Sequence, residues 1–120
     1  MARLSFPRRG EVFLVSFDPT VGSEIRKTRP ALVIQNDVAN EFSPITIVAA
    51  ITTKFGPTLR PTEALISSGE GGLTQPSVVL LNQLRSIDRS RMIKKLGVVD
   101  PLTLKRVGNC LKISLDLIGL

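Results

Sequence analysis

Polar and charged side chains gather in residues 22–30, which join two apolar runs of the chain. The segment holds three cations, Arg26, Lys27 and Arg29, and one acid, Glu24. Arginine stays protonated and presents a planar fork of donors that suits phosphate oxygens, so the segment indicates contact with a phosphate ester. A solvated hairpin loop of the same composition would carry no chemistry, and the segment alone leaves both interpretations open.

The residue types that are missing narrow the chemistry. The chain has no histidine, so the usual proton shuttle is not available, and its single cysteine is Cys110. Without clustered ligands we expect neither a metal site nor a cofactor, and there is no phosphate-binding P-loop or dinucleotide fingerprint. Cys110 lies beside the apolar stripe of a predicted helix, which favours a small buried hydrophobe over a nucleophile. One cysteine also suits a reducing cytoplasm, where we expect the protein to act.

The charge balance indicates a polyanionic partner. Sixteen lysines and arginines against ten acids give a net charge of +6, which favours nucleic acid over a membrane, although many proteins are basic for solubility alone. The longest nearly uncharged run, 43–53, is too short to cross a bilayer, so we expect no membrane association. The length of 120 residues favours one domain, 1–120, and the hydrophobic fraction of 42% suggests apolar surface buried between subunits.

The elements that must position the polar segment are mostly strands. Short runs rich in β-branched and aromatic residues predict strands at 11–17, 30–35, 45–52, 62–66, 77–81 and 95–99. Pro30 is expected at the first position of its strand. Asn36 is a candidate cap for one helical turn, and residues 87–91 are typical of a tight helical turn.

The C-terminal segment has a different pattern, typical of a helix. Asp100 and Pro101 form a start signal, and Gly119 is expected to end the helix. Its predicted apolar face consists of Leu104, Val107, Leu111, Leu115 and Ile118. Six short strands and one helix together predict a mainly β fold, a small curled sheet or barrel with the helix packed against it.

Several segments, taken in chain order, resemble the MazF/PemK (Kid) toxin family. They are RGEV at 9–12, DPTVGSE at 18–24, TRP at 28–30, VIQND at 33–37, SP at 43–44, IVAAIT at 47–52, SVVLLNQLRSID at 77–88 and LKISL at 111–115. Each segment is weak evidence by itself, but together they span nearly the whole chain. The resemblance implies an SH3-like β-barrel of the MazF/PemK/CcdB type with a C-terminal helix, usually a homodimer.

The resemblance also implies a function and a set of site residues. Members are toxins of type II toxin–antitoxin systems that cleave single-stranded RNA, usually mRNA, at short sequences without a metal ion, and a MazE-like antitoxin is the expected partner. Arg29 and Thr52 match the catalytic positions. The residues expected to contact RNA are Ser23, Glu24, Arg26, Lys27, Thr28, Gln83 and Arg85. Many members have a glycine-containing linker before the Arg-Pro pair, where this chain has Ile25-Arg26-Lys27-Thr28, and the histidine and aspartate of some PemK-type members have no match here.

The residues themselves suggest a mechanism. RNA carries its own nucleophile, the 2′-hydroxyl, whose attack on phosphorus places negative charge on the phosphoryl oxygens. Arg29 can stabilise that charge, and Thr52 can donate one more hydrogen bond, although a threonine at a strand end needs no functional reason. Glu24 is a candidate to read a base, to orient Arg29 or to accept the 2′-proton, in that order.

Two other functions stay open at this point. A gyrase-poisoning toxin like CcdB shares the expected architecture, but that family ends in a Trp-Gly-Ile type of tail, whereas this chain ends Ile118-Gly119-Leu120 and has no tryptophan. A non-catalytic barrel that binds RNA or a peptide would need the same basic surface as a nuclease.

Overall fold

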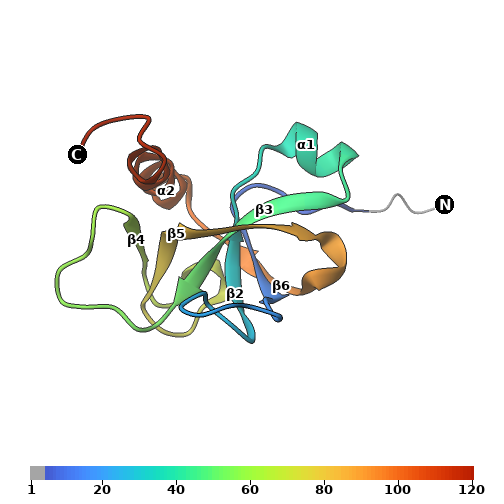
Figure 1. Ribbon diagram of the computed structural model, residues 1–120, viewed down its shortest axis with the longest axis horizontal. Helices are drawn as coiled ribbons and strands as arrows, with labels where there is room; N and C mark the ends of the chain where they lie inside the picture. The colour runs from blue at the N-terminus through green and yellow to red at the C-terminus, as the bar shows by residue number, and fades with distance from the viewer. Residues whose placement is uncertain (1–4) are drawn as a thin grey trace.

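The computed structural model describes residues 5–120, and its centre is one antiparallel sheet of six strands with the order β4-β5-β3-β2-β1-β6. The strands are β1 (Glu11–Ser16), β2 (Thr28–Val33), β3 (Ile45–Thr52), β4 (Glu63–Ile66), β5 (Ser77–Asp88) and β6 (Met92–Val98). The helices are α1 (Asp37–Phe42) and α2 (Pro101–Ser114), with short 3-10 turns η1 (Glu70–Gly72) and η2 (Arg89–Arg91). Figure 1 shows α2 beside β4 and β5. The predicted mainly β class with a C-terminal helix is confirmed.

Two hydrophobic cores lie on opposite faces of the sheet. The inner core is enclosed by β1, β2, β3, the second half of β5 and β6, which curl around it like a small barrel; its buried residues are Val15, Phe17, Ala31, Val33, Val48, Ala50 and Ile87. The outer core lies under α2 and includes Leu32, Ala49, Ile51, Ile66 and Val107. Neighbouring residues of β2 and β3 therefore enter different cores, which explains why both strands read as continuous apolar runs.

The turn η1 brings the two edges of the sheet together. It follows edge strand β4 and packs against edge strand β6. Gly72 has φ +76°, and a Cβ atom there would overlap the carbonyl oxygen of Leu96; a Cβ on Gly97 would lie 2.6 Å from the carbonyl carbon of Gly71. The backbones of η1 and β6 approach so closely that only glycine fits on either side.

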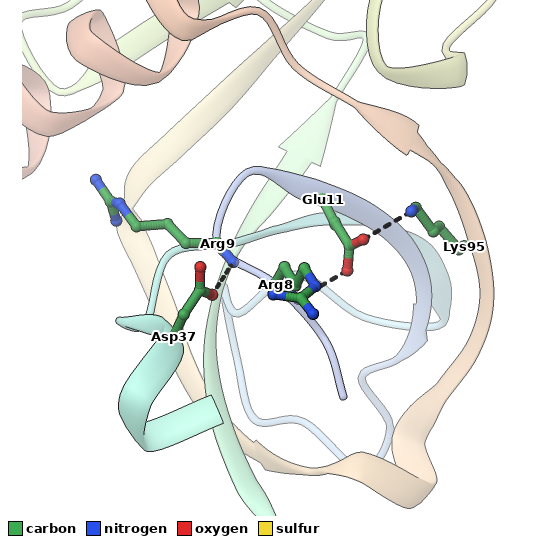
Figure 2. Close-up of polar contacts among 5 residues, drawn as sticks. All are labelled: Arg8, Arg9, Glu11, Asp37 and Lys95. Atoms are coloured by element: carbon green, nitrogen blue, oxygen red, sulfur yellow. Dashed lines mark hydrogen bonds and ion pairs between the residues drawn. The ribbon is translucent and has the colours of Figure 1, made fainter. Parts of the chain in front are cut away.

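The start of β1 is fixed by polar contacts that Figure 2 shows. The Glu11 carboxylate, 7% exposed, accepts a hydrogen bond from the Arg8 backbone N–H at 2.7 Å and pairs with Lys95 Nζ of β6 at 2.7 Å. The Arg9 backbone N–H donates to Asp37 of α1, also at 2.7 Å. The segment before β1 is thus tied to β6 and α1.

Three strands, β2, β5 and β6, differ from the sequence prediction by more than one residue at an end. β2 begins at Thr28, so Pro30 is its third residue; β2 pairs with β3 only from Ala31 onward, and the missing N–H of Pro30 therefore costs no ladder bond to β3. β5 continues from the predicted end at 81 to Asp88, across polar residues. β6 begins at Met92, because a strand at the sheet edge tolerates the charged Lys94 and Lys95.

The helix predictions hold in part. Asn36 caps α1, with its side chain accepting from the Ala39 N–H, and the turn expected near 87–91 is η2. Asp100 occupies the N-cap position of α2, but its side chain makes no capping hydrogen bond.

The end of α2 differs from the prediction. The helix stops at Ser114 rather than at Gly119, because Asp116 takes a left-handed conformation with φ 59°. The N–H groups of Asp116 and Leu117 then bond back to the carbonyls of Ile113 and Lys112, which closes a Schellman motif. Of the predicted apolar face, the part beyond the helix end is exposed, namely Leu115 and Ile118.

No helix within residues 5–120 combines the length and the apolar character needed to cross a membrane.

The close approach of η1 to β6 gives a stability prediction. Gly72→Ala and Gly69→Ala both place a side chain at a positive φ, which costs about 1–2 kcal/mol. At Gly69 a Cβ atom meets nothing within 4 Å, whereas at Gly72 it overlaps the backbone of β6. We expect Gly72→Ala to lower the free energy of unfolding, measured in urea, clearly more than Gly69→Ala. Equal losses would contradict the proposed backbone contact.

Candidate active site

Arg29 and Thr52 come together across the β2–β3 pair. Ala31 of β2 lies opposite Ala50 of β3, and continuing this antiparallel register by two residues places Arg29 opposite Thr52. Residues directly opposite each other point to the same face of a sheet. Both side chains line one pocket of about 170 Å³, which we call the Arg29 pocket.

The donors of the two side chains are only partly used within the protein. Arg29 Nε donates to the Arg26 carbonyl at 3.0 Å, while its two terminal nitrogens have no hydrogen-bond partner among the described residues. Thr52 Oγ1 accepts from the Lys54 N–H at 3.1 Å, so the hydroxyl proton remains available to donate. The Arg29 pocket can therefore offer several hydrogen bonds and one positive charge to an anionic group.

The other residues that line the Arg29 pocket are either apolar or polar without a charge. Within the described part of the chain, Arg29 is the one ionised side chain that lines it; the other lining residues are Pro30, Ile51, Thr53, Leu73, Thr74, Gln75 and Ser77. The sequence analysis did not identify the four residues at 73–75 and 77. The hydroxyl- and amide-bearing run Thr74-Gln75-Pro76-Ser77, which leads into β5, was the available signal, but nothing in it indicated proximity to Arg29.

Glu24, Gln83 and Arg85 line a second pocket of about 150 Å³, which we call the Glu24 pocket. The Glu24 carboxylate accepts from the Val21 N–H at 2.5 Å, and Gln83 Oε1 accepts from the Ile25 N–H at 3.4 Å. Residues 25–29 connect the two pockets, since Ile25 lines one and Arg29 the other. The five predicted site residues that line a pocket therefore divide between two neighbouring pockets rather than sharing one.

A bulge in β5 places Gln83 in this second pocket. Ala49 of β3 pairs with Leu84, but the next residue, Ala50, pairs with Leu80, so residues 81–83 of β5 have no partner on β3. Such a bulge bends the strand and redirects its side chains. The sequence predicted a strand that ends at 81 and gave no sign of the bulge.

The loop between β1 and β2 carries the other predicted RNA contacts, and all are exposed: Ser23, Arg26, Lys27 and Thr28. Arg26 Nη2 donates to the Gly22 carbonyl at 3.0 Å. Lys27 has φ 68°, a left-handed conformation that is uncommon for a residue with a side chain, and its N–H donates to Asp18 Oδ1 at 3.0 Å. The loop is therefore held in shape by its own polar contacts.

Arg85 is more occupied than the sequence suggested. Its guanidinium donates to the carbonyl of Phe17 and, at 3.4 Å, to that of Pro19. These bonds leave fewer donors for a phosphate, so the expected RNA contact of Arg85 stays a prediction.

Cys110 lies apart from this chemistry. Burial raises the pKa of the Cys110 thiol, whose sulfur lies 3.6 Å from the Glu63 carbonyl, as expected of a small hydrophobe on the packed side of α2. In residues 5–120 there is no group of three or more Cys, Asp or Glu side chains arranged to hold a metal ion.

Comparison with known proteins identifies the family. Residues 8–115 match the family described as PemK-like, MazF-like toxin of type II toxin-antitoxin system. Endoribonuclease EndoA of Bacillus subtilis (strain 168) is 43% identical over 111 residues, which cover 92% of this chain and 96% of that protein.

Solved structures agree with this match. MazF from Deinococcus radiodurans has a TM-score of 0.80 and 26% identity, covering 93% of this chain and 98% of that one. A MazE-MazF structure from the same organism has a TM-score of 0.69 and 25% identity, with coverage of 93% and 98%. The chain therefore belongs to the family of PemK-like and MazF-like toxins of type II toxin–antitoxin systems.

Proposed function

We propose that this toxin is an endoribonuclease that cleaves single-stranded RNA, mRNA above all, at short sequences. The observation that carries the proposal is the Arg29 pocket, where a guanidinium and a hydroxyl with unused donors meet in a chain 43% identical to an endoribonuclease. Residues 1–120 would act as one toxin domain in the cytoplasm, where mRNA is translated.

The cleavage step uses the 2′-hydroxyl of the substrate as the nucleophile. A bond forms between the 2′-oxygen and the adjacent phosphorus, and the bond from phosphorus to the 5′-oxygen breaks. The upstream fragment keeps a 2′,3′-cyclic phosphate, and the 5′-oxygen leaves with a proton as a hydroxyl. The terminal nitrogens of Arg29 and the Thr52 hydroxyl stabilise the charge that develops on the phosphoryl oxygens.

The Glu24 pocket is suited to recognition rather than to this bond change. Arg29 is oriented by the Arg26 carbonyl and not by Glu24, whose carboxylate is bonded to the Val21 N–H. Glu24 and Gln83 offer an acceptor and an amide to the edge of a base, while Arg26 and Lys27 contact phosphates and Ser23 and Thr28 contribute hydroxyls.

Removal of Arg29 tests the catalytic centre. We expect Arg29→Ala to fold normally and to lose about a hundred- to a thousandfold in cleavage rate, the usual cost of one preorganised donor. Lys105→Ala, which removes one charge from the exposed surface of α2, serves as the matched control and should cleave like the parent. Cleavage of a long RNA, followed by mapping of 5′ ends, gives the rate and the target sequence. Unchanged cleavage by Arg29→Ala would remove the assignment, and binding without any cut by the parent would favour a non-catalytic barrel.

The identity of the nucleophile is tested by the products. Attack by the 2′-hydroxyl predicts that cleavage persists in EDTA, that the downstream fragment has a free 5′-hydroxyl, and that one deoxyribose immediately before the cut stops the reaction. DNA of the same sequence should bind through its phosphates without being cut. Mass spectrometry of the fragments decides the matter, because a 5′-phosphate product would require a different nucleophile.

The partners are a second copy of the chain and a MazE-like antitoxin. Beyond the end of α2 the chain exposes apolar side chains, among them Leu117, which is 69% exposed, and Leu120, which is 94% exposed; a second subunit can cover such a surface. The MazE-MazF structure of D. radiodurans supports an antitoxin partner. We place an acidic antitoxin segment over the basic RNA surface, where charge is complementary.

Sedimentation velocity and competition test these partners. We expect a dimer at micromolar concentration, and we expect an acidic antitoxin peptide to abolish RNA binding and cleavage together. A monomer that persists at high concentration would contradict the dimer. A peptide that binds while cleavage continues would place the antitoxin elsewhere.

A further inference from the structure

Two arginines hold the backbone at the point where β1 leads into the β1–β2 loop. Arg91 of η2 donates to the carbonyls of Ser16 at 3.2 Å and Asp18 at 2.6 Å. Arg85 of β5 donates to the carbonyls of Phe17 and Pro19. The four successive carbonyls of residues 16–19 thus alternate between the two guanidinium groups, which lie more than sixty residues away in sequence.

This held segment is bonded in turn to the residues just before Arg29. The Asp18 carboxylate accepts from the Lys27 N–H at 3.0 Å, and the Phe17 N–H donates to the Lys27 carbonyl at 3.0 Å. The neighbouring residue, Arg26, supplies the carbonyl that orients Arg29 Nε. A continuous path of hydrogen bonds and short backbone therefore runs from Arg91 through Asp18 and Lys27 to Arg29.

We infer that Arg91, assisted by Arg85, is a positioning residue that sets the place of the Arg29 guanidinium in the Arg29 pocket. A guanidinium suits this task, because it stays protonated and one of its terminal nitrogens, Nη1, carries two N–H donors, enough for the carbonyls of both Ser16 and Asp18. Arg91 does not touch the RNA in this role. The inference rests on the proposed function, since it assigns Arg91 an effect on the cleavage step through Arg29.

The expected effect is on turnover more than on binding. A displacement of about 1 Å at a reacting group can cost on the order of a hundredfold in rate. The phosphate-binding side chains Arg26 and Lys27 stay on the loop when Arg91 is removed, so the affinity for RNA should change little. Loss of a merely structural contact would instead lower the stability of the protein, and it would not lower kcat selectively while leaving KM unchanged.

The test compares Arg91→Ala and Arg91→Lys with Lys94→Ala. Lys94 is an exposed residue of β6 close in sequence, so Lys94→Ala removes the same charge without touching the loop. For Arg91→Ala we expect kcat to fall about 10- to 100-fold with KM within about twofold of the parent. Arg91→Lys should recover part of kcat, and Lys94→Ala should behave like the parent. If Arg91→Ala does not fold, Arg91→Lys carries the same comparison.

Amide hydrogen exchange on the RNA-free protein provides a second test that does not depend on cleavage. The N–H groups of Phe17 and Lys27 should exchange faster in Arg91→Ala than in the parent. In Lys94→Ala they should exchange at the parent's rate. Parent-like kcat with unchanged exchange would overturn the inference, and so would an equal fall in kcat for Lys94→Ala. If the parent protein cleaves no RNA, the proposed function is wrong. The exchange rate of the Lys27 N–H in Arg91→Ala still decides whether Arg91 holds the loop.

Discussion

The register between β2 and β3 is the constraint on which the site depends. Because successive side chains of a strand point to opposite faces, a slip of β2 by one residue would exchange its inner-core and outer-core side chains. Ala31 would leave the inner core while Ala50 stayed, and Arg29 would no longer face the same pocket as Thr52. The apolar residues on both faces of β3 therefore fix more than stability. They place a guanidinium and a hydroxyl from distant parts of the chain opposite one another.

Beyond the ends of the strands, polar contacts fix the conformation of the chain. In the β1–β2 loop, backbone carbonyls and amides are paired with side chains of Asp18, Arg26 and Arg85, and the Glu24 carboxylate is bonded within the loop. Such pairing lowers the conformational freedom that a loop of this length would otherwise have. The donors that remain unused, at the end of the Arg29 side chain, are those that can act on a substrate. The loop is therefore shaped before RNA arrives.

The sequence predicted the six strands, the C-terminal helix and the meeting of Arg29 with Thr52, because apolar periodicity and family motifs carry this information directly. The prediction was wrong where a boundary depends on contacts distant in sequence. β5 continues through polar residues to Asp88 because β3 pairs with it again from Leu84 onward, beyond the bulge. α2 ends early because Asp116 adopts a left-handed conformation, for which glycine is the usual signal. Likewise, the contacts of Arg91 with Ser16 and Asp18 join residues more than seventy positions apart, and no local pattern indicates them.

The three unpaired residues of the β5 bulge have a consequence for how this fold can diversify. Residues 81–83 make no ladder bonds with β3, so the pairing on either side does not depend on the identity of Asn82 or Gln83. Substitution of Gln83, the bulge residue that lines the Glu24 pocket, can alter the shape and polarity of that pocket while the register that joins Arg29 to Thr52 is conserved. The residues that determine the target sequence are then different from the residues that keep the nuclease folded and competent. A directed-evolution library confined to Gln83, with the buried Leu81 left unchanged, therefore explores recognition with little risk of unfolding the protein.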